Sequence, residues 1–299
     1  MLDNRMMTFL TVCQFMNFTK AGEALNLTQP AVSQHIHYLE ENYGIKLFEF
    51  KGKKMFLTKE GKAFLSAAKT MYHNEICLRE KLDILKEQKK ILNFGATLTI
   101  GEFLMPHYLS KYMEKNPNLI VKMQVANTKE LLTKIDEGEI DFAFVEGYFS
   151  KEEYNSLVYS KEAYIAVCGK DYVLQKEPCY LEELCSERIL VRERGSGTRE
   201  ILERAMEEQN LSLKDFISVA EIGNLQTIKA LVEHHLGITF LYRRAVLKEL
   251  EQGSLREIQV RDFKVHHDFN CIWRKGSIFE EEYLEIFQQM KEVEKIRIS

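Results

Sequence analysis

Residues 18–44 have the sequence FTKAGEALNLTQPAVSQHIHYLEENYG, which indicates how the first part of the chain folds. Thr19 is the expected N-cap of a first short helix that runs to about residue 25. A turn at residues 26–27 follows this helix. Thr28 is expected to cap a second helix that has Pro30 in its first turn, where the missing N–H costs little. Gly44 lies just past the end of that second helix. Two helices joined by a tight turn predict a helix-turn-helix.

The second helix has two faces of different character. An apolar stripe runs along it at Val32, Ile36 and Leu39, spaced so that one side can pack on the first helix. The other face carries uncharged donors and acceptors that can hydrogen-bond base edges in a major groove, namely Gln29, Ser33, Gln34 and His37. The alternative is a solvated polar face without a nucleic-acid role.

A basic turn follows this helix. Residues 46–48 and 50–58 are together predicted to form two short strands around a basic turn that contains Gly52, which would make a wing. Lys51, Lys53 and Lys54 lie in or beside the turn and are expected to reach phosphates next to the groove. The whole chain carries a net charge of -4, so a local concentration of lysines is the feature that favours DNA contact.

The pattern F-x-x-V, then F-T-x-A-x-x-L-x-L-T-Q-P-A-V-S-Q-x-I-x-x-L-E-x-x-x-G-x-x-L-F and L-T-x-x-G, spans residues 9–61. It closely resembles the LysR-type regulators. The resemblance implies double-stranded promoter or operator DNA as a partner, with contacts from Thr28, Gln29, Pro30, Ser33, Gln34, His37, Lys51, Lys53 and Lys54. Three positions depart from the family pattern: Gly22 replaces a usual alanine, Asn17 a common serine, and Phe50 a frequent arginine. The loss of that arginine puts one phosphate contact in doubt.

Residues 59–88 contain no proline, and Gly61, their only glycine, lies in the first turn of a predicted long helix. Apolar residues follow one another at alternating steps of four and three, interrupted by Glu75: Phe64, Ala68, Met71, Leu78, Leu82 and Leu85. This row predicts a dimer seam, and the alternative is an amphipathic helix packed on its own domain. The resemblance favours a homodimer through this helix, and a homotetramer built from two dimers.

After residue 90, strand-like runs alternate with helical ones, which predicts parallel sheets with crossover helices. Strands are expected at residues 91–96, 119–126, 140–145, 164–168, 189–192, 217–220, 238–241 and 269–273. Helices are expected at residues 101–115, 129–137, 199–208 and 225–234, with a final helix from about residue 279. Two such α/β lobes resemble the LysR effector domain and the periplasmic-binding-protein architecture, whose ligand lies in a cleft between the lobes.

The chain is therefore predicted to be multidomain. A winged helix-turn-helix, mainly α-helical, is assigned to residues 1–58 and a linker helix for dimerisation to residues 59–90. A two-lobed α/β effector-binding domain is assigned to residues 91–299. Lobe I comprises residues 91–161 and 266–299, and lobe II residues 162–265. The chain is expected to cross between the lobes near residues 160–162 and 264–267.

Polar loops that enter helices are the candidate effector site. Hydroxyls and free helix-terminal N–H groups suit a small anionic metabolite. The expected contacts come from four such loops and comprise Thr97, Leu98, Thr99, Asn127, Gly195, Ser196, Gly197, Thr198 and Asn224. Plain helix capping is the alternative for Asn127 and Asn224.

Composition argues against several other classes of protein. No apolar run is long enough to cross a bilayer, and residues 1–18 lack the pattern of a secretory signal, so we expect a cytoplasmic protein without a membrane role. Six cysteines without a CxxC pair predict reduced thiols, with redox sensing as the alternative. No metal site, cofactor or catalytic motif is expected. An enzyme, or an anion sensor that has lost DNA affinity, remains the competing hypothesis.

Overall fold

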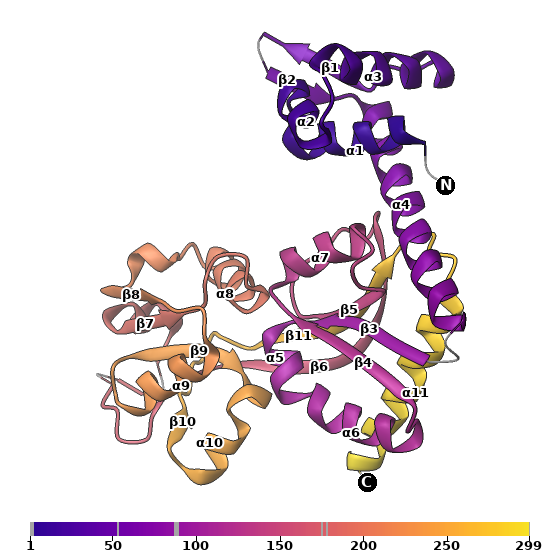
Figure 1. The fold of residues 1–299 in the computed structure, drawn as a ribbon. Coiled ribbons are helices and arrows are strands. Elements are labelled where there is room, and N and C mark those ends of the chain that lie inside the picture. Colours follow the sequence, from indigo (N-terminus) through magenta and orange to yellow (C-terminus); the bar gives the residue numbers. More distant parts are fainter. Residues whose placement is uncertain (1–2, 53, 87–89, 175, 178, 299) are drawn as a thin grey trace. The chain divides into compact units, whose positions relative to one another are not determined.

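The structure is a computed structural model that describes residues 3–52, 54–86, 90–174, 176–177 and 179–298. The chain divides into two compact units. The first unit comprises Met1–Gln88 with Lys134–Glu139 and Arg274–Glu280, and the second comprises Lys89–Thr133, Ile140–Trp273 and Glu281–Ser299. Figure 1 shows the helices and strands of each unit.

Three short helices begin the first unit: α1 (Asn4–Phe15), α2 (Phe18–Leu25) and α3 (Gln29–Tyr43). The predicted start of α2 at Thr19 is wrong. Asn17 is the N-cap, because its side chain accepts a hydrogen bond from the Lys20 backbone N–H at 3.0 Å. The predicted cap of α3 is confirmed, since Thr28 Oγ1 accepts from the Ala31 N–H, and Gly44 ends the helix with φ of 65°.

The apolar stripe of α3 packs into the core of the first unit. Val32, Ile36 and Leu39 are buried there together with Phe9 from α1. Burying each of these side chains stabilises the domain by about 2 kcal/mol. The polar face of α3 is thereby left outward, as the pattern predicts.

The wing consists of β1 (Phe48–Lys51) and β2 (Lys54–Leu57), which pair antiparallel with Lys51 opposite Lys54. Gly52 occupies the turn with φ of +64°, a conformation that favours glycine. The first strand begins two residues later than predicted. Leu47 is fully buried, and its carbonyl accepts from the Thr58 N–H, so this residue packs into the core before the strand begins.

Helix α4 (Lys59–Lys86) follows the wing. Phe64 and Ala68, predicted to lie in a dimer seam, instead pack against the core of their own domain. The remaining described part of the predicted row is exposed: Met71 by 51%, Leu78 by 41% and Leu82 by 49%. The side chain of Leu85 lies outside the described residues.

A buried polar cluster ties α4 to the other two segments of the first unit. Arg274 Nη1 donates to Asp136 Oδ1 at 2.9 Å, and Lys69 Nζ lies 2.6 Å from Asp136 Oδ2. Arg274 also donates to the Ser66 carbonyl and to Thr70 Oγ1. Arg274 is fully buried, and the carboxylate of Asp136 compensates its charge.

The second unit is built on one mixed sheet with the strand order β4-β3-β5-β11-β6-β9-β7-β8, and β10 pairs with β6. Lobe I contains β3 (Lys90–Ala96), parallel to both β4 (Leu119–Val125) and β5 (Phe142–Val145). The connecting helices are α5 (Leu98–Phe103), α6 (Met105–Lys115) and α7 (Thr128–Asp136). The single helix predicted at residues 101–115 is wrong, because Pro106 cannot continue the backbone hydrogen bonding and starts a new helix.

Lobe II contains β7 (Arg188–Val191), β8 (Ser218–Glu221) and β9 (Ile238–Tyr242), with β7 parallel to both neighbours. Its helices and short strand are α8 (Gly197–Glu207), α9 (Leu225–Glu233), α10 (Leu247–Gln252) and β10 (Leu255–Glu257). Three 3₁₀ turns complete the described part of this lobe: η1 (Leu181–Ser186), η2 (Leu213–Asp215) and η3 (Arg243–Val246).

Two long strands join the lobes, as Figure 1 shows: β6 (Tyr154–Gly169) and β11 (Val265–Arg274). The strand predicted at residues 164–168 is therefore much longer, and residues 160–162 lie inside it. Helix α11 (Glu280–Ile298) ends the chain. The architecture is a two-lobed α/β fold, as predicted.

Candidate functional site

The outward face of α3 carries the predicted base-contacting side chains. Gln29, Gln34 and His37 are exposed, and Ser33 is half-buried. Gln29 Nε2 donates to Ser33 Oγ at 2.9 Å, and His37 Nε2 lies 3.1 Å from Glu41 Oε1. These weak exposed contacts leave the polar groups free to exchange partners. Thr28 and Pro30 have structural roles at the start of the helix.

The wing, which follows α3 in the chain, carries exposed lysines. Lys51 Nζ lies 3.3 Å from Glu49 Oε1, and Lys54 is exposed, whereas Lys53 lies outside the described residues. Phe50 is 65% exposed on β1, where the family pattern often has arginine. The wing therefore offers an apolar ring and at least two cations to the surface.

The second unit holds a polar cluster where its lobes meet. Glu146, which directly follows β5, accepts hydrogen bonds from three threonines. Thr97 Oγ1 donates to Oε2, while Thr99 Oγ1 and Thr198 Oγ1 donate to Oε1 at 3.1 and 2.9 Å. Thr97 and Thr99 belong to lobe I, and Thr198 belongs to lobe II. The carboxyl group is thus held by hydroxyls from both lobes.

The side chain of Glu146 is almost completely buried. The residue is only 1% exposed, and burial raises the pKa of its carboxyl group, although the three hydroxyl donors and the charge of Arg192 act in the opposite direction. Glu146 was not predicted as a site residue. A charged residue at the carboxyl end of an apolar parallel strand, in the sequence FAFVE, is the signal that could have identified it.

Three buried polar atoms near this cluster have no hydrogen-bond partner among the described residues: Arg192 Nη1, Thr128 Oγ1 and Tyr242 Oη. Arg192 is 6% exposed, and its Nε and Nη2 atoms bind Glu193 at 2.8 and 2.9 Å. Buried polar groups are normally hydrogen-bonded, so unpartnered ones call for an explanation. A ligand or bound water at this position would supply it.

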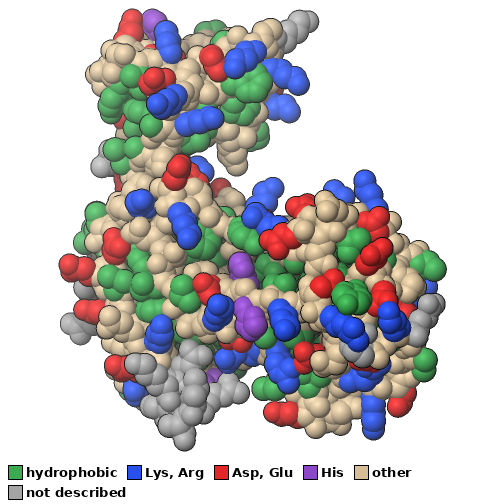
Figure 2. Space-filling view, turned by 180° about the vertical axis from the view of Figure 1, so that it is seen from behind, with side chains coloured by type: hydrophobic (Ala, Val, Ile, Leu, Met, Phe, Trp, Pro, Cys, Tyr) green, Lys and Arg blue, Asp and Glu red, His purple; other side chains and the backbone are tan. Residues whose placement is uncertain are grey.

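Close backbone contact brings the two lobes together beside Glu146. A Cβ atom placed on Gly197 would lie 2.8 Å from Gly147 Cα. On the same side, the Arg204 guanidinium lies 3.4 Å from the centre of the Tyr148 ring, which also packs edge-on against His267. In the view of Figure 2, His side chains lie among Lys and Arg side chains along the middle of the second unit.

The structure brings only some of the predicted effector residues together. Thr97, Thr99 and Thr198 meet at Glu146, with Gly195, Ser196 and Gly197 in the loop that leads to Thr198. Leu98 packs against the apolar core of lobe II. Asn127 and Asn224 act as helix caps, since their side chains accept from the Glu130 and Thr227 N–H groups.

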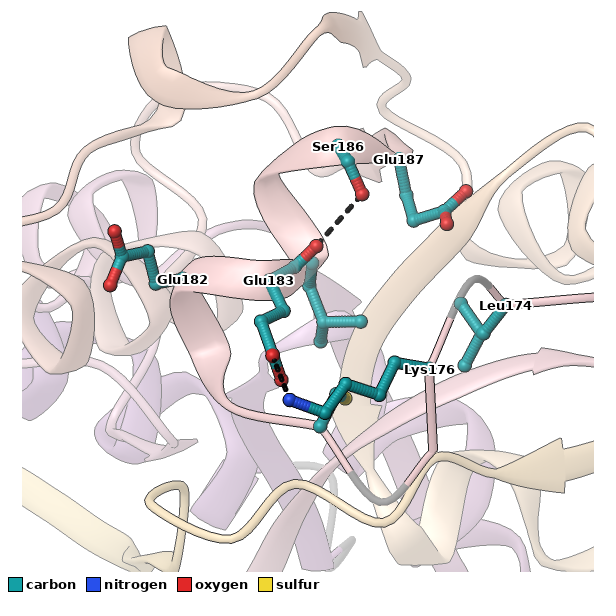
Figure 3. Close-up of a pocket in the computed structure, with 8 residues that line it drawn as sticks. Leu174, Lys176, Glu182, Glu183, Ser186 and Glu187 are labelled. Carbon is teal, nitrogen blue, oxygen red and sulfur yellow. Dashed lines mark hydrogen bonds and ion pairs between the residues drawn. The ribbon is translucent and has the colours of Figure 1, made fainter.

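A separate depression of ≈ 670 Å³ lies in lobe II beside η1. Its lining includes Glu182, Glu183 and Glu187, with Lys176 as the cation. Figure 3 shows Lys176 directed at Glu183, whose Oε1 lies 2.5 Å from Nζ, whereas Glu182 points away. Three carboxylates against one ammonium group disfavour anion binding here.

The cysteines are free thiols. Burial raises the pKa of Cys13 to about 12 and that of Cys168 to about 11, which disfavours the reactive thiolate form. Among the described residues, no group of three His, Cys, Asp or Glu side chains is arranged to hold a metal ion.

Within the same described part of the chain, no helix is both long enough and apolar enough to span a bilayer.

Comparisons with known proteins agree with this architecture. Residues 4–62 match the bacterial regulatory helix-turn-helix protein, lysR family, and residues 86–292 match the LysR substrate binding domain. The HTH-type transcriptional activator CmpR of Synechocystis is 29% identical over 269 residues, which cover 90% of this chain and 88% of CmpR.

Two solved structures share the fold. Corynebacterium glutamicum OxyR, as an H2O2-bound mutant, has a TM-score of 0.61 at 21% identity, covering 98% of this chain and 92% of that chain. The Synechocystis CcmR regulatory domain in complex with 2-PG has a TM-score of 0.59 at 19% identity, covering 67% of this chain and 96% of that chain. The matched relatives are transcriptional regulators rather than enzymes, and this chain belongs to the LysR family of transcriptional regulators, with a DNA-binding and an effector-binding domain.

Proposed function

We propose that this regulator binds promoter DNA sequence-specifically through α3 and the wing, and that a small anionic effector bound between its two α/β lobes controls it. One observation supports the proposed effector site. Hydroxyl donors from both lobes meet at one buried position, beside the unpartnered Nη1 of Arg192. A ligand bound there would contact both lobes, so its affinity depends on their arrangement.

The chemistry of the donors favours an oxyanion or a carboxylate. Thr97, Thr99 and Thr198 each supply a hydroxyl, and Arg192 supplies a buried guanidinium. The first N–H groups of α8 belong to the same segment as Thr198 and have no acceptor within the helix. Ser196, the N-cap of this helix, makes no capping hydrogen bond through its side chain. The complex of the CcmR regulatory domain with 2-PG shows that a small molecule binds this fold.

Dimerisation through α4 is part of the proposal. The exposed side chains of Met71, Leu78 and Leu82 are spaced by seven and four positions and therefore form one apolar row along the helix. A second copy of the chain would cover this row, and two such dimers would form the expected tetramer. The regulator is proposed to act in the cytoplasm, where its DNA target lies.

Fluorescence anisotropy with the promoter upstream of its own gene tests the DNA half. The Gln34→Ala variant is expected to lose discrimination between this promoter and a scrambled duplex. The Lys54→Ala variant is expected to weaken binding to both duplexes and to lower the salt slope by about 0.9. Lys151→Ala, at an exposed position of the second unit, is the control. Equal weak binding of the wild type to both duplexes would show an anion sensor without sequence-specific DNA recognition.

A thermal-shift screen of sulfate, inorganic phosphate and small carboxylates tests the effector half. Binding of an anion to the native state raises the melting temperature with increasing ligand concentration. Stabilisation only by cationic or apolar compounds would contradict the proposed class of ligand.

A further inference from the structure

The position that an anionic effector should occupy already holds a carboxyl group of the protein itself. All three hydroxyls that define the site donate to Glu146, and Thr97, Thr99 and Thr198 are each at most 2% exposed. A hydroxyl has one proton to donate, so none of the three can donate to a bound anion while it binds Glu146. An effector must therefore either replace these contacts or use other donors.

Other donors are present on the side of lobe II. Arg192, at the end of β7, has its Nη1 atom buried and without a partner among the described residues, as does Tyr242 at the end of β9. The charge of Glu146 acts on Tyr242, which places the two groups near each other. Thr128 adds a third unpartnered group, a hydroxyl from lobe I. These donors have the chemistry to bind an oxyanion, provided that its negative charge and that of Glu146 do not coexist.

The negative charges of ionised Glu146 and of a bound oxyanion would repel each other strongly in one buried site, because little solvent screens them. Protonation of Glu146 removes this repulsion and also turns the group from an acceptor into a donor. We propose that the effector site takes up an oxyanion together with one proton, which is held on Glu146, so that Glu146 and Arg192 bind the anion from opposite lobes. The inference rests on the proposed anionic effector. The proton comes from solvent and is released again when the anion leaves.

Two tyrosines interact electrostatically with Glu146. Tyr164 Oη lies 2.9 Å from the carbonyl oxygens of Thr198 and Phe240, and burial raises its pKa well above its ordinary value. Burial likewise raises the pKa of Tyr242, so both phenols stay neutral. Arg204 lies over Tyr148 on the side of α8.

His267 is a rival for the proton. It forms a hydrogen bond to the backbone of Glu146, and burial lowers its pKa, so the imidazole is held mainly in its neutral form near pH 7. Burial raises the pKa of the Glu146 carboxyl group, which favours its protonated form. Glu146 is thus the group expected to gain a proton when an anion approaches.

Isothermal titration calorimetry on the full-length protein tests this, with sulfate as the probe because its charge does not change near neutral pH. Titrations in two buffers with different ionisation enthalpies give the number of protons exchanged on binding. We expect uptake of protons when sulfate binds, and an affinity for sulfate that rises as the pH falls.

The Glu146→Gln variant should bind sulfate with no proton uptake and little dependence on pH, since an amide offers a donor at every pH. Glu152→Gln, at an exposed position of the same lobe, is the control that should keep the proton uptake. Circular dichroism checks that Glu146→Gln folds, and the two-buffer measurement on the wild type stands without any variant.

Binding of sulfate by the wild type without proton uptake would overturn the inference and leave the anion site in place. Proton uptake that persists in Glu146→Gln, or that disappears only in His267→Gln, would also overturn it. No binding of sulfate, phosphate or small carboxylates at either pH would overturn both the inference and the proposed effector class.

Discussion

Thr198 Oγ1, in the first turn of α8, donates a hydrogen bond of 2.9 Å to Glu146 Oε1 at the end of β5. This bond joins lobe II to lobe I directly at the candidate effector site. Both residues are buried, so the bond is shielded from water, and a hydrogen bond to a buried carboxyl group is stronger than one at the surface. An effector that replaces it can change how the lobes are held together.

Replacing Thr198 with valine keeps the shape of the side chain and removes its hydroxyl. Because the hydroxyl that holds Glu146 from lobe II is lost, the carboxyl group is less well positioned to bind the anion, and we expect affinity for the anionic effector to fall about tenfold. Thermal shift with increasing sulfate or phosphate measures this change. Thr133→Val, at an exposed position of α7, is the matched control, and promoter binding should be retained in both variants. Loss of promoter binding in Thr198→Val would show that the two functions are not separable at this residue.

Replacing Arg274 with methionine should destabilise the protein by about 3 kcal/mol. The change removes the 2.9 Å contact of Arg274 with the buried carboxylate of Asp136, which also contacts Lys69. Chemical denaturation followed by circular dichroism measures the free energy of unfolding. Arg243→Met, which removes an exposed ion pair with Glu257, should cost about 0–1 kcal/mol. Equal effects of the two changes would contradict a special role for the buried cluster.

Gly61 is required by backbone packing. A Cβ atom at this position would lie 2.1 Å from the Leu47 carbonyl oxygen, and a backbone atom cannot move aside as a flexible side chain can. We expect Gly61→Ala to destabilise the DNA-binding domain by about 1–3 kcal/mol and to lower promoter affinity through partial unfolding. Gly223→Ala, where the nearest atom to the added Cβ would be Glu193 Oε2 at 3.6 Å, is the comparison for packing. A wild-type melting temperature for Gly61→Ala would contradict this account.

Phe50→Arg should restore a cation at the wing. Since Phe50 is exposed and makes no essential core contact, the change should leave stability almost unaltered. One added phosphate contact would tighten binding to all DNA sequences and steepen the salt dependence by about 0.9. Anisotropy titrations at several salt concentrations measure the slope. An unchanged slope would place this side chain away from the DNA backbone.

Leu82→Glu should weaken the proposed dimer, because it places a charge in the exposed apolar row of α4. Sedimentation velocity over a range of protein concentrations is expected to show a larger monomer fraction than in the wild type. Val173→Glu replaces another exposed apolar residue, in the second unit, and serves as the control. Dissociation by Val173→Glu instead would locate the interface elsewhere.

Local sequence signals were sufficient for most of the fold. Thr28, Pro30 and Gly44 mark the limits of α3 because capping and turn preferences act over a few residues. The alternation of strands and helices likewise indicated the two α/β lobes. Errors occurred where neighbouring segments compete, as at Thr19, where Asn17 forms the cap, and at Leu104, where Pro106 divides one predicted helix into two.

The LysR-type organisation follows from the resemblance of residues 9–61 to that family. The outward polar face of α3 and the polar loops at Thr97, Thr99 and Thr198 follow from the amino-acid sequence, since each depends on local spacing. The convergence of these three hydroxyls on Glu146 follows from tertiary packing, because it joins residues 47 to 52 positions apart and no local pattern encodes it. The same holds for Phe64 and Ala68, which belong to the domain core rather than to the exposed row of α4. Burial depends on which elements pack together, and that packing is settled when the whole chain has folded.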